Sequence, residues 1–317
     1  MIRPIEWLTQ ILAVAAALAA APLFLGWINQ CRAWLQNRSA PSILLPYRGL
    51  LKLFHKDAVL AETASPLFRA APYLVFGAMV TAAAIIPSSG TRLPFATAAD
   101  AIALVGLFAT ARVFLSLAAM DVGTAFGTLG ARREMMVGFL AEPALLMIIF
   151  VASLISSTTA LPVISERLAA QGLHLSPSLA FSAVAFTMVL LAENARIPVD
   201  NPATHLELTM IHEAMLLEYS ARHLALMEWA AALKLFNYAC IGFALFIPWG
   251  AAMGEAGPAA LAIALPLLAL KLLVAGAGLA LIETVSAKLR VFRAPEFLAT
   301  AFLFAVLGLL VHLLLGS

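Results

Sequence analysis

Charged residues are scarce in this chain. Only 11% of its 317 residues are Asp, Glu, Lys or Arg, while 63% are hydrophobic, and the mean hydropathy is +0.99. Soluble domains are about a quarter charged and about half apolar, so one soluble core could not bury this much apolar surface. The composition indicates an integral membrane protein. The small net charge of +2 gives no reason to expect nucleic acid as a partner.

The chain also contains few cysteines and lacks several common catalytic and binding motifs. Cys31 and Cys240 are far apart and form no Cys-x-x-Cys pair, which is the pattern that supplies thiolates to iron–sulfur clusters and zinc sites. The chain has no glycine-rich phosphate loop, no Gly-x-Ser-x-Gly and no His-Glu-x-x-His. We therefore expect no metal site, cofactor or catalytic residue in this chain. The two cysteines read as small apolar core residues.

Eight stretches are apolar over the length of about 20 residues that a membrane-spanning helix needs. They are residues 7–30, 66–87, 100–121, 134–156, 177–194, 224–250, 258–284 and 296–315. The fifth is the shortest. The first exceeds the apolar core of a signal peptide, about 7–15 residues, and is expected to be a span. The sequence thus predicts one all-α membrane domain over residues 1–317, with about eight transmembrane helices.

Lys and Arg are distributed unevenly between the two sides of these spans. Three lie on one side, at Arg3, Arg92 and Arg167, and three lie inside spans. The other side holds Arg32, Arg38, Arg48, Lys52, Lys56, Arg69, Arg132, Arg133, Arg196, Arg222, Lys288, Arg290 and Arg293. Cytoplasmic loops carry the excess of basic residues. We therefore expect loops 31–65 and 195–223 to be cytoplasmic and both termini periplasmic, in a bacterial inner membrane.

Several charged side chains fall inside or at the ends of the predicted spans. They are Arg112, Glu142, Glu228, Lys234, Lys271 and Glu283. A charge near mid-bilayer costs about 2.5–3.5 kcal/mol on insertion scales and usually has a partner. Glu228 and Lys234 are six residues apart and do not share one helical face, so their partners are expected on other helices or subunits. A proton or charge relay fits these residues; structural pairs between helices and snorkelling lysines remain open alternatives.

The loop before the sixth span concentrates acidic residues. It holds Glu193, Arg196, Pro198, Asp200, Glu207, Leu208 and then Glu218, Tyr219 and Ser220. Pro198 and Pro202 break the helix, and a short helix is expected from about 203 to 216. His205 and His212 are seven residues apart, which is not a metal-binding pattern. A solvated charged face is the plain alternative.

This loop motif resembles that of one family of membrane subunits. The family contains subunit 1 of respiratory complex I and the corresponding subunit of the membrane-bound NiFe hydrogenases. Val199 stands where complex I has Phe, Ala203 and His205 stand where it has two glutamates, and a few extra residues precede Glu218. These departures resemble the hydrogenase-4 and formate hydrogenlyase branch of the family. Residues outside the loop that fit the same patterns are Gln36, Arg38, Pro41, Lys52, Asp121, Gly123, Ala131 to Glu134, Glu142, Pro143, Lys234, Ile247 to Gly250, Lys271, Ala280 to Glu283, Leu289 and Arg290.

The resemblance, which covers residues 20–293, implies a membrane anchor for a soluble redox arm. Loops 31–65 and 195–223 would dock the hydrogenase large and small subunits and a ferredoxin-like iron–sulfur subunit. Antiporter-like subunits would adjoin the chain within the bilayer. The Ni–Fe centre and the iron–sulfur clusters would lie in those partners, and this chain would couple their chemistry to proton translocation.

Two sets of residues are candidates for these roles. The coupling candidates are Arg112, Asp121, Glu134, Glu142, Glu193, Asp200, Glu207, Glu218, Glu228, Lys234, Lys271 and Glu283. The docking candidates are Arg38, Lys52, Arg132, Arg133, Arg196, His205, His212 and Tyr219.

Three other functions remain open at this stage. The first is a quinone-chamber subunit of complex I. The second is a stand-alone carrier, which the lack of an internal repeat disfavours. The third is a structural anchor in which the buried charges only join helices.

Overall fold

The computed structural model of the protein describes residues 4–91, 94–95, 100–172, 176–200, 210–252, 258–287, 289 and 293–315. Helices joined by turns and loops make up these ranges. The β-type contact among them is an isolated bridge between Gly90 and Ala252. The expected all-α fold is therefore confirmed.

Each of the eight apolar windows corresponds to one helix. In chain order these are α1 (Pro4–Leu35), α3 (Pro66–Ile85), α5 (Ala101–Asp121), α6 (Ala125–Ser156), α8 (Pro177–Glu193), α10 (Ala221–Phe246), α11 (Pro258–Val285) and α12 (Ala294–Leu315). Within the described ranges, seven of them are long and apolar enough to cross a membrane. The eighth is α8, which has 17 residues and matches the window expected to be the shortest.

Helix α6 begins earlier than the expected residue 134. Thr124 provides the reason, because its side chain accepts a hydrogen bond from the backbone N–H of Gly127 at 3.3 Å and so caps the first turn. The charged residues 132–134 therefore lie on the helix and not in the loop before it. This places Glu134 on the same helix as Glu142.

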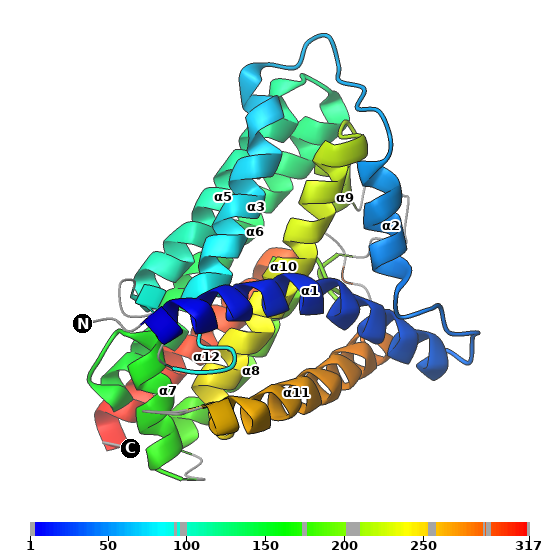
Figure 1. Ribbon diagram of the computed structural model, residues 1–317. Coiled ribbons are helices and arrows are strands. Elements are labelled where there is room, and N and C mark those ends of the chain that lie inside the picture. The colour runs from blue at the N-terminus through cyan, green and yellow to red at the C-terminus, as the bar shows by residue number, and fades with distance from the viewer. Residues whose placement is uncertain are drawn as a thin grey trace.

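Helix α10 is the central helix of the bundle. In its apolar window 67% of the residues are buried, compared with 22% in α11 and in α12. It packs against α3 and α1, while α12 packs against α6 and α8. Figure 1 shows α3, α5 and α6 running side by side, and α1 beside α11. The start of α1 and the end of α12 lie on the left of that view, away from α2 and α9. The exposed sides of α11 and α12 are left to lipid or to other subunits.

Three short helices occupy the connections. They are α2 (Leu45–Phe54), α7 (Leu161–Ala170) and α9 (His212–Leu216). The helix expected from about 203 to 216 does end at Leu216, but the prediction is wrong for Met210 and Ile211, which are not helical. The Asp200 carboxylate accepts a hydrogen bond from the backbone N–H of His212 at 3.2 Å, next to the first turn of α9. Residues 201–209 lie outside the described residues.

The two long loops are joined to each other. The Ser220 hydroxyl accepts a hydrogen bond from the backbone N–H of Val59 at 2.9 Å and donates one to the Val59 carbonyl at 2.6 Å. Farther along the first loop, the Asp121 carboxylate accepts a hydrogen bond from the N–H of Ser65 at 2.9 Å. The loops that the sequence places on the cytoplasmic side therefore form one connected surface.

Candidate functional site

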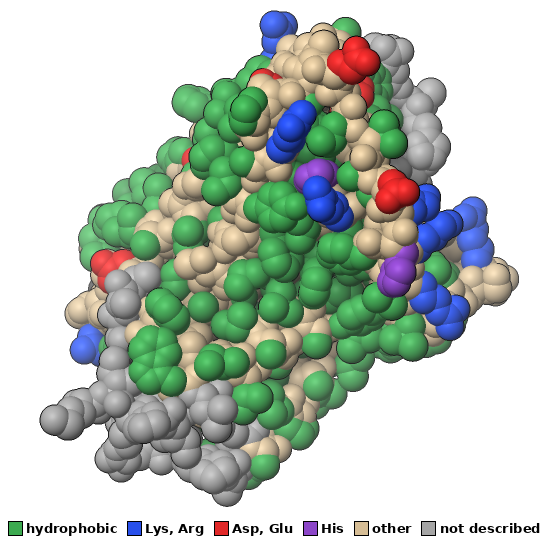
Figure 2. Space-filling model, turned by 45° about the horizontal axis from the view of Figure 1, so that its top comes forward, with side chains coloured by type: hydrophobic (Ala, Val, Ile, Leu, Met, Phe, Trp, Pro, Cys, Tyr) green, Lys and Arg blue, Asp and Glu red, His purple; other side chains and the backbone are tan. Residues whose placement is uncertain are grey.

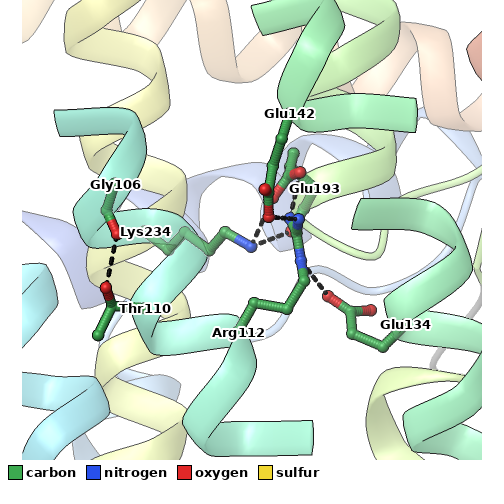
Figure 3. Close-up of polar contacts among 7 residues, drawn as sticks. All are labelled: Gly106, Thr110, Arg112, Glu134, Glu142, Glu193 and Lys234. Atoms are coloured by element: carbon green, nitrogen blue, oxygen red, sulfur yellow. Dashed lines mark hydrogen bonds and ion pairs between the residues drawn. The ribbon is translucent and has the colours of Figure 1, made fainter. Parts of the chain in front are cut away.

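Five charged side chains meet in the interior of the bundle. Arg112 comes from α5, Glu134 and Glu142 from α6, Glu193 from the end of α8 and Lys234 from α10. Figure 3 shows them pointing toward one another from these four helices. We call these five residues the charge cluster.

Arg112 is the hub of the charge cluster. Its Nε lies 3.3 Å from a Glu134 carboxylate oxygen, and its Nη1 lies 2.5 Å from Glu142. Its Nη2 forms a third ion pair, with Glu193. The Arg112 side chain is 5% exposed and that of Glu193 is 2% exposed, so the bundle removes both from solvent. A guanidinium can satisfy three carboxylates at once because its five N–H donors form a planar fork.

Lys234 joins the charge cluster from the opposite side. Its Nζ lies 2.9 Å from the second carboxylate oxygen of Glu193 and donates a hydrogen bond to the backbone carbonyl of the same residue at 2.7 Å. A cation is favourable at this position, because Glu193 is the last residue of α8 and carbonyls at a helix C-terminus carry partial negative charge. The partner of Lys234 thus comes from another helix, as its spacing from Glu228 predicts.

Gly138 makes room for the Arg112 guanidinium. Glu134, Gly138 and Glu142 are four residues apart in α6, so they share one face of the helix. A β-carbon at position 138 would overlap the guanidinium and lie 2.7 Å from Arg112 Cδ. The sequence analysis missed Gly138, although the four-residue spacing of the glutamates around a glycine is visible in the sequence.

The charge cluster contains more carboxylates than cations. Three glutamates face two basic side chains, so the cluster carries a formal charge of −1 when every member is ionised. An unbalanced charge is costly in a low-dielectric interior. Glu142 is the most exposed carboxylate of the three, at 33% of its side chain. This arrangement can bind one proton and release it without leaving an unpaired cation.

A second group of charges surrounds Glu283 of α11. Its carboxylate lies 3.2 Å from Arg196 and 3.5 Å from Arg32, and its side chain is 1% exposed. Burial lowers the pKa of Arg196, while the negative charge of Glu283 partly offsets this effect. The structure thus connects the ends of α1 and α11 to the loop that follows α8. Arg32 was not among the site candidates.

One cavity of about 540 Å³ touches both groups of charges. Its apolar wall includes Leu25, Val75, Met79, Phe108 and Leu115. Its polar wall comprises Asn29, Arg32, Arg112, Glu134, Glu193, Asn194, Arg196, Asp200, His212, Glu213, Glu228 and Lys234. The cavity thus connects the charge cluster to the segment between α8 and α9.

The other coupling candidates lie apart from the charge cluster. Lys271 donates a hydrogen bond to the carbonyl of Ile247 at 2.6 Å, and its Nζ lies 5.7 Å from the centre of the Phe243 ring. Asp121 bonds to the first loop, as described above. Glu228 is exposed at the cavity, and Glu218 is partly exposed. Glu207 lies outside the described residues. No described group of three or more His, Cys, Asp or Glu side chains is arranged to hold a metal ion.

The docking candidates divide into exposed and internal residues. Arg38, Lys52 and Arg132 are exposed. Arg133 donates a hydrogen bond to the Met210 carbonyl at 2.8 Å and is partly buried. His212 is partly buried at the start of α9, and His205 lies outside the described residues.

Tyr219 and Arg196, which are also docking candidates, make contacts inside this chain. Tyr219 is 3% exposed because its ring stacks on Phe68, with centroids 4.0 Å apart, and its hydroxyl donates to the Phe68 carbonyl at 3.1 Å. Burial, together with the negative charge of Asp121, raises the Tyr219 pKa. Arg196 is engaged by Glu283. Both residues hold the loops in place from inside this chain.

Gly138→Ala tests the geometry of the charge cluster. The added methyl group would displace the Arg112 guanidinium, and overpacking of this kind costs about 1–3 kcal/mol. We expect a lower melting temperature for the purified variant in detergent. Gly106→Ala in α5 is the matched control, because a β-carbon there meets nothing within 4 Å. Equal melting temperatures for the two variants would contradict the close approach of Arg112 to α6.

Comparison with known proteins places the chain in a family. The model of the NADH dehydrogenase family matches residues 8–314. Formate hydrogenlyase subunit 4 of Escherichia coli (strain K12) is 33% identical over 290 residues, covering 92% of this chain and 93% of that protein. Hydrogenase-4 component C of the same organism is 34% identical over 235 residues, covering 74% of this chain and 73% of that protein.

A solved structure shares the fold. It is the membrane-bound sulfane sulfur reductase, an archaeal respiratory membrane complex, of which one chain superposes with a TM-score of 0.80 at 21% identity, covering 96% of this chain and 98% of that one. The matches in sequence and the shared fold agree over nearly the full length. The chain therefore belongs to the NADH dehydrogenase family of complex I subunit 1-like membrane proteins, in the branch of formate hydrogenlyase subunit 4 and hydrogenase-4 component C.

Proposed function

We propose that this chain is the membrane anchor and coupling subunit of a hydrogen-evolving NiFe hydrogenase or formate hydrogenlyase complex. The observation that carries the proposal is the buried charge cluster, which meets a cavity beneath the segment between α8 and α9. The similarity to formate hydrogenlyase subunit 4 along almost the whole chain supports the choice of complex.

The proposed partners follow from the family. Hydrogenase large and small subunits and a ferredoxin-like iron–sulfur subunit would dock on the connected loops, and antiporter-like subunits would cover lipid-exposed helices. The Ni–Fe centre and the iron–sulfur clusters would belong to these partners. The two cysteines of this chain are both buried and free, in different helices, which supports placing these ligand sets in the partners.

The coupling step is proposed to begin at Glu193. This residue ends α8, and Arg196, in the segment that follows, pairs with Glu283. A docked redox subunit that displaces this segment would draw the Glu193 carboxylate away from Arg112 and Lys234. The remaining cluster would then balance two cations against Glu134 and Glu142. Return of Glu193 would restore the excess negative charge, and Glu142 would take up a proton. Repeated displacement of the segment would thus make Glu142 bind and release a proton in each cycle.

The connected loops are proposed to face the cytoplasm of a bacterium. This can be tested by cysteine labelling after replacing Cys31 and Cys240 with serine. Gln171→Cys, after α7, and Lys56→Cys, after α2, are both at exposed positions. An impermeant maleimide added to intact cells is expected to label position 171 but not position 56. Labelling of position 56 but not of position 171 would mean that the topology is the reverse of the one proposed.

The cavity makes a quinone site the second candidate function, since its apolar wall and clustered polar groups are what small-molecule sites share. Purification of the native complex through a tag on this chain separates the two functions. Nickel and hydrogen evolution that co-purify with the chain are expected. Flavin together with NADH–quinone activity, and no nickel, would support a complex I subunit and contradict the hydrogenase proposal.

Glu142→Gln tests coupling in the purified complex. The amide cannot exchange a proton with the charge cluster, so hydrogen evolution is expected to continue while the proton gradient formed in liposomes is lost. Glu193→Gln is expected to impair both, because Arg112 and Lys234 lose a charged partner. Glu62→Gln, at an exposed loop position, is the control. If neither cluster variant changes turnover or the gradient, the chain is an anchor without a role in proton movement.

A further inference from the structure

Basic residues accumulate in the first loop without any acidic counterpart. From Trp7 to Lys56 the sequence contains no Asp or Glu, yet it contains Arg32, Arg38, Arg48, Lys52 and Lys56. Arg32 is engaged by Glu283. The other four are exposed, and no ion pair links them to a carboxylate of the described residues. Figure 2 shows Lys and Arg side chains gathered on the right of the drawn face, beside the end of α1 and α2.

Large apolar side chains are exposed among these basic residues. On α2, Leu51 is 58% exposed and Phe54 is 41% exposed, and at the end of α1 Trp34 is 55% exposed. Leu51 and Phe54 are three residues apart, and Arg48 and Lys52 are four apart, so each pair forms a strip along the helix. The outer face of α2 therefore carries an apolar strip next to a basic strip.

Contacts on the inner side prevent α2 from turning this face inward. The Tyr47 hydroxyl donates a hydrogen bond to the Ala19 carbonyl of α1. Phe54 lies at the edge of the outer face, since one side of its ring meets the Trp229 ring of α10 edge-on with centroids 6.3 Å apart, while 41% of the residue stays exposed. These contacts fix both the start and the end of α2 on the bundle.

The segment that leads into α2 is held just as closely. It crosses α1 at Gly26, where a β-carbon would overlap the carbonyl group of Ile43. The absence of a side chain at Gly26 is what allows this close approach. The outward face of α2 is thus fixed by the fold and is not an adaptable surface.

This combination matches the chemistry of an anionic lipid surface. A helix with one apolar and one basic strip lies in the plane of the headgroups, with its apolar side chains toward the acyl chains. Clusters of four to eight Lys and Arg next to a membrane span attract anionic headgroups, and Trp favours the same interfacial depth. A neutral lipid would leave the basic strip without counter-charge, and an acidic soluble partner would leave Leu51 and Phe54 in water.

We propose that α2 and the end of α1 bind an anionic phospholipid, with Arg48 and Lys52 at the phosphate and with Leu51, Phe54 and Trp34 against the acyl chains. This site is distinct from the charge cluster and goes beyond the proposed hydrogenase function. It would hold regardless of which redox complex contains the chain.

Trp34 reports on the site directly. The full chain, purified in detergent, is titrated with brominated phosphatidylglycerol and separately with brominated phosphatidylcholine, since bromine quenches the fluorescence of a tryptophan in contact with the lipid. The quenching that disappears in Trp34→Phe is the signal from the site. We expect half-maximal quenching of Trp34 at a much lower mole fraction of the anionic lipid than of the neutral one.

Charge removal provides the decisive comparison. Arg48→Gln combined with Lys52→Gln is expected to weaken phosphatidylglycerol binding about 30-fold, because each basic residue at an anionic surface contributes about a factor of five. Arg69→Gln combined with Arg132→Gln removes two exposed basic residues elsewhere and is expected to change little. Exchange of Arg48 for Lys and Lys52 for Arg, which keeps the charge, is expected to preserve binding.

Two results would overturn the proposal. One is equal quenching of Trp34 by the anionic and the neutral lipid, which would mean that the helix only touches the bilayer. The other is an equal effect of the two double variants, which would mean that overall charge, and not this site, attracts the lipid. Helical circular dichroism and the melting temperature of every variant are compared with the wild type, so that loss of binding is separated from loss of folding.

Discussion

The rest of the structure depends on the burial of Arg112. A guanidinium in the interior of a membrane bundle is stable only when carboxylates and hydrogen-bond acceptors surround it. Here they come from α6 and α8, so the ion pairs fix how these helices approach α5. Removing one partner of a buried ion pair costs about 3–5 kcal/mol, so the helices around Arg112 can shift only if charge or a proton shifts with them. The same contacts thus serve stability and the coupling that we propose.

Most of the fold could be predicted from the sequence, because each long apolar window corresponds to one helix whose side chains contact lipid or other helices. The surface helix α2 and the short helix α7 were missed, since each has 10 residues and neither produces an apolar window. The start of α6 was placed too late because residues 132–134 look like a charged loop. In the structure Glu134 turns inward to Arg112, and the helix extends past it.

The members of the charge cluster could be predicted from the sequence, but the ion pairs that they form could not. Arg112, Glu142 and Lys234 stood out because charge is rare inside spans, whereas their shared contact with Glu193 depends on how four helices pack. The ion pair of Arg32 with Glu283 joins the first span to the seventh. Because the two residues are far apart in the sequence, local spacing could not predict this pair. Tyr219 shows the converse, because a motif residue that looked suited to docking stacks on Phe68 inside the protein. Family motifs select the candidate residues, and the packing decides what each of them touches.

Helix α8 is too short to reach across the bilayer. Its 17 residues extend about 26 Å at 1.5 Å per residue, less than the roughly 30 Å of a hydrocarbon core. A helix of this length that began at one face of the hydrocarbon core would therefore end at membrane depth. Irregular backbone is tolerated there only when protein surrounds it or when it lines a wet space, and residues 194–196 do line the cavity. The early end of α8 thus places irregular backbone, and not a further helical turn, directly after Glu193 at the polar wall of the cavity.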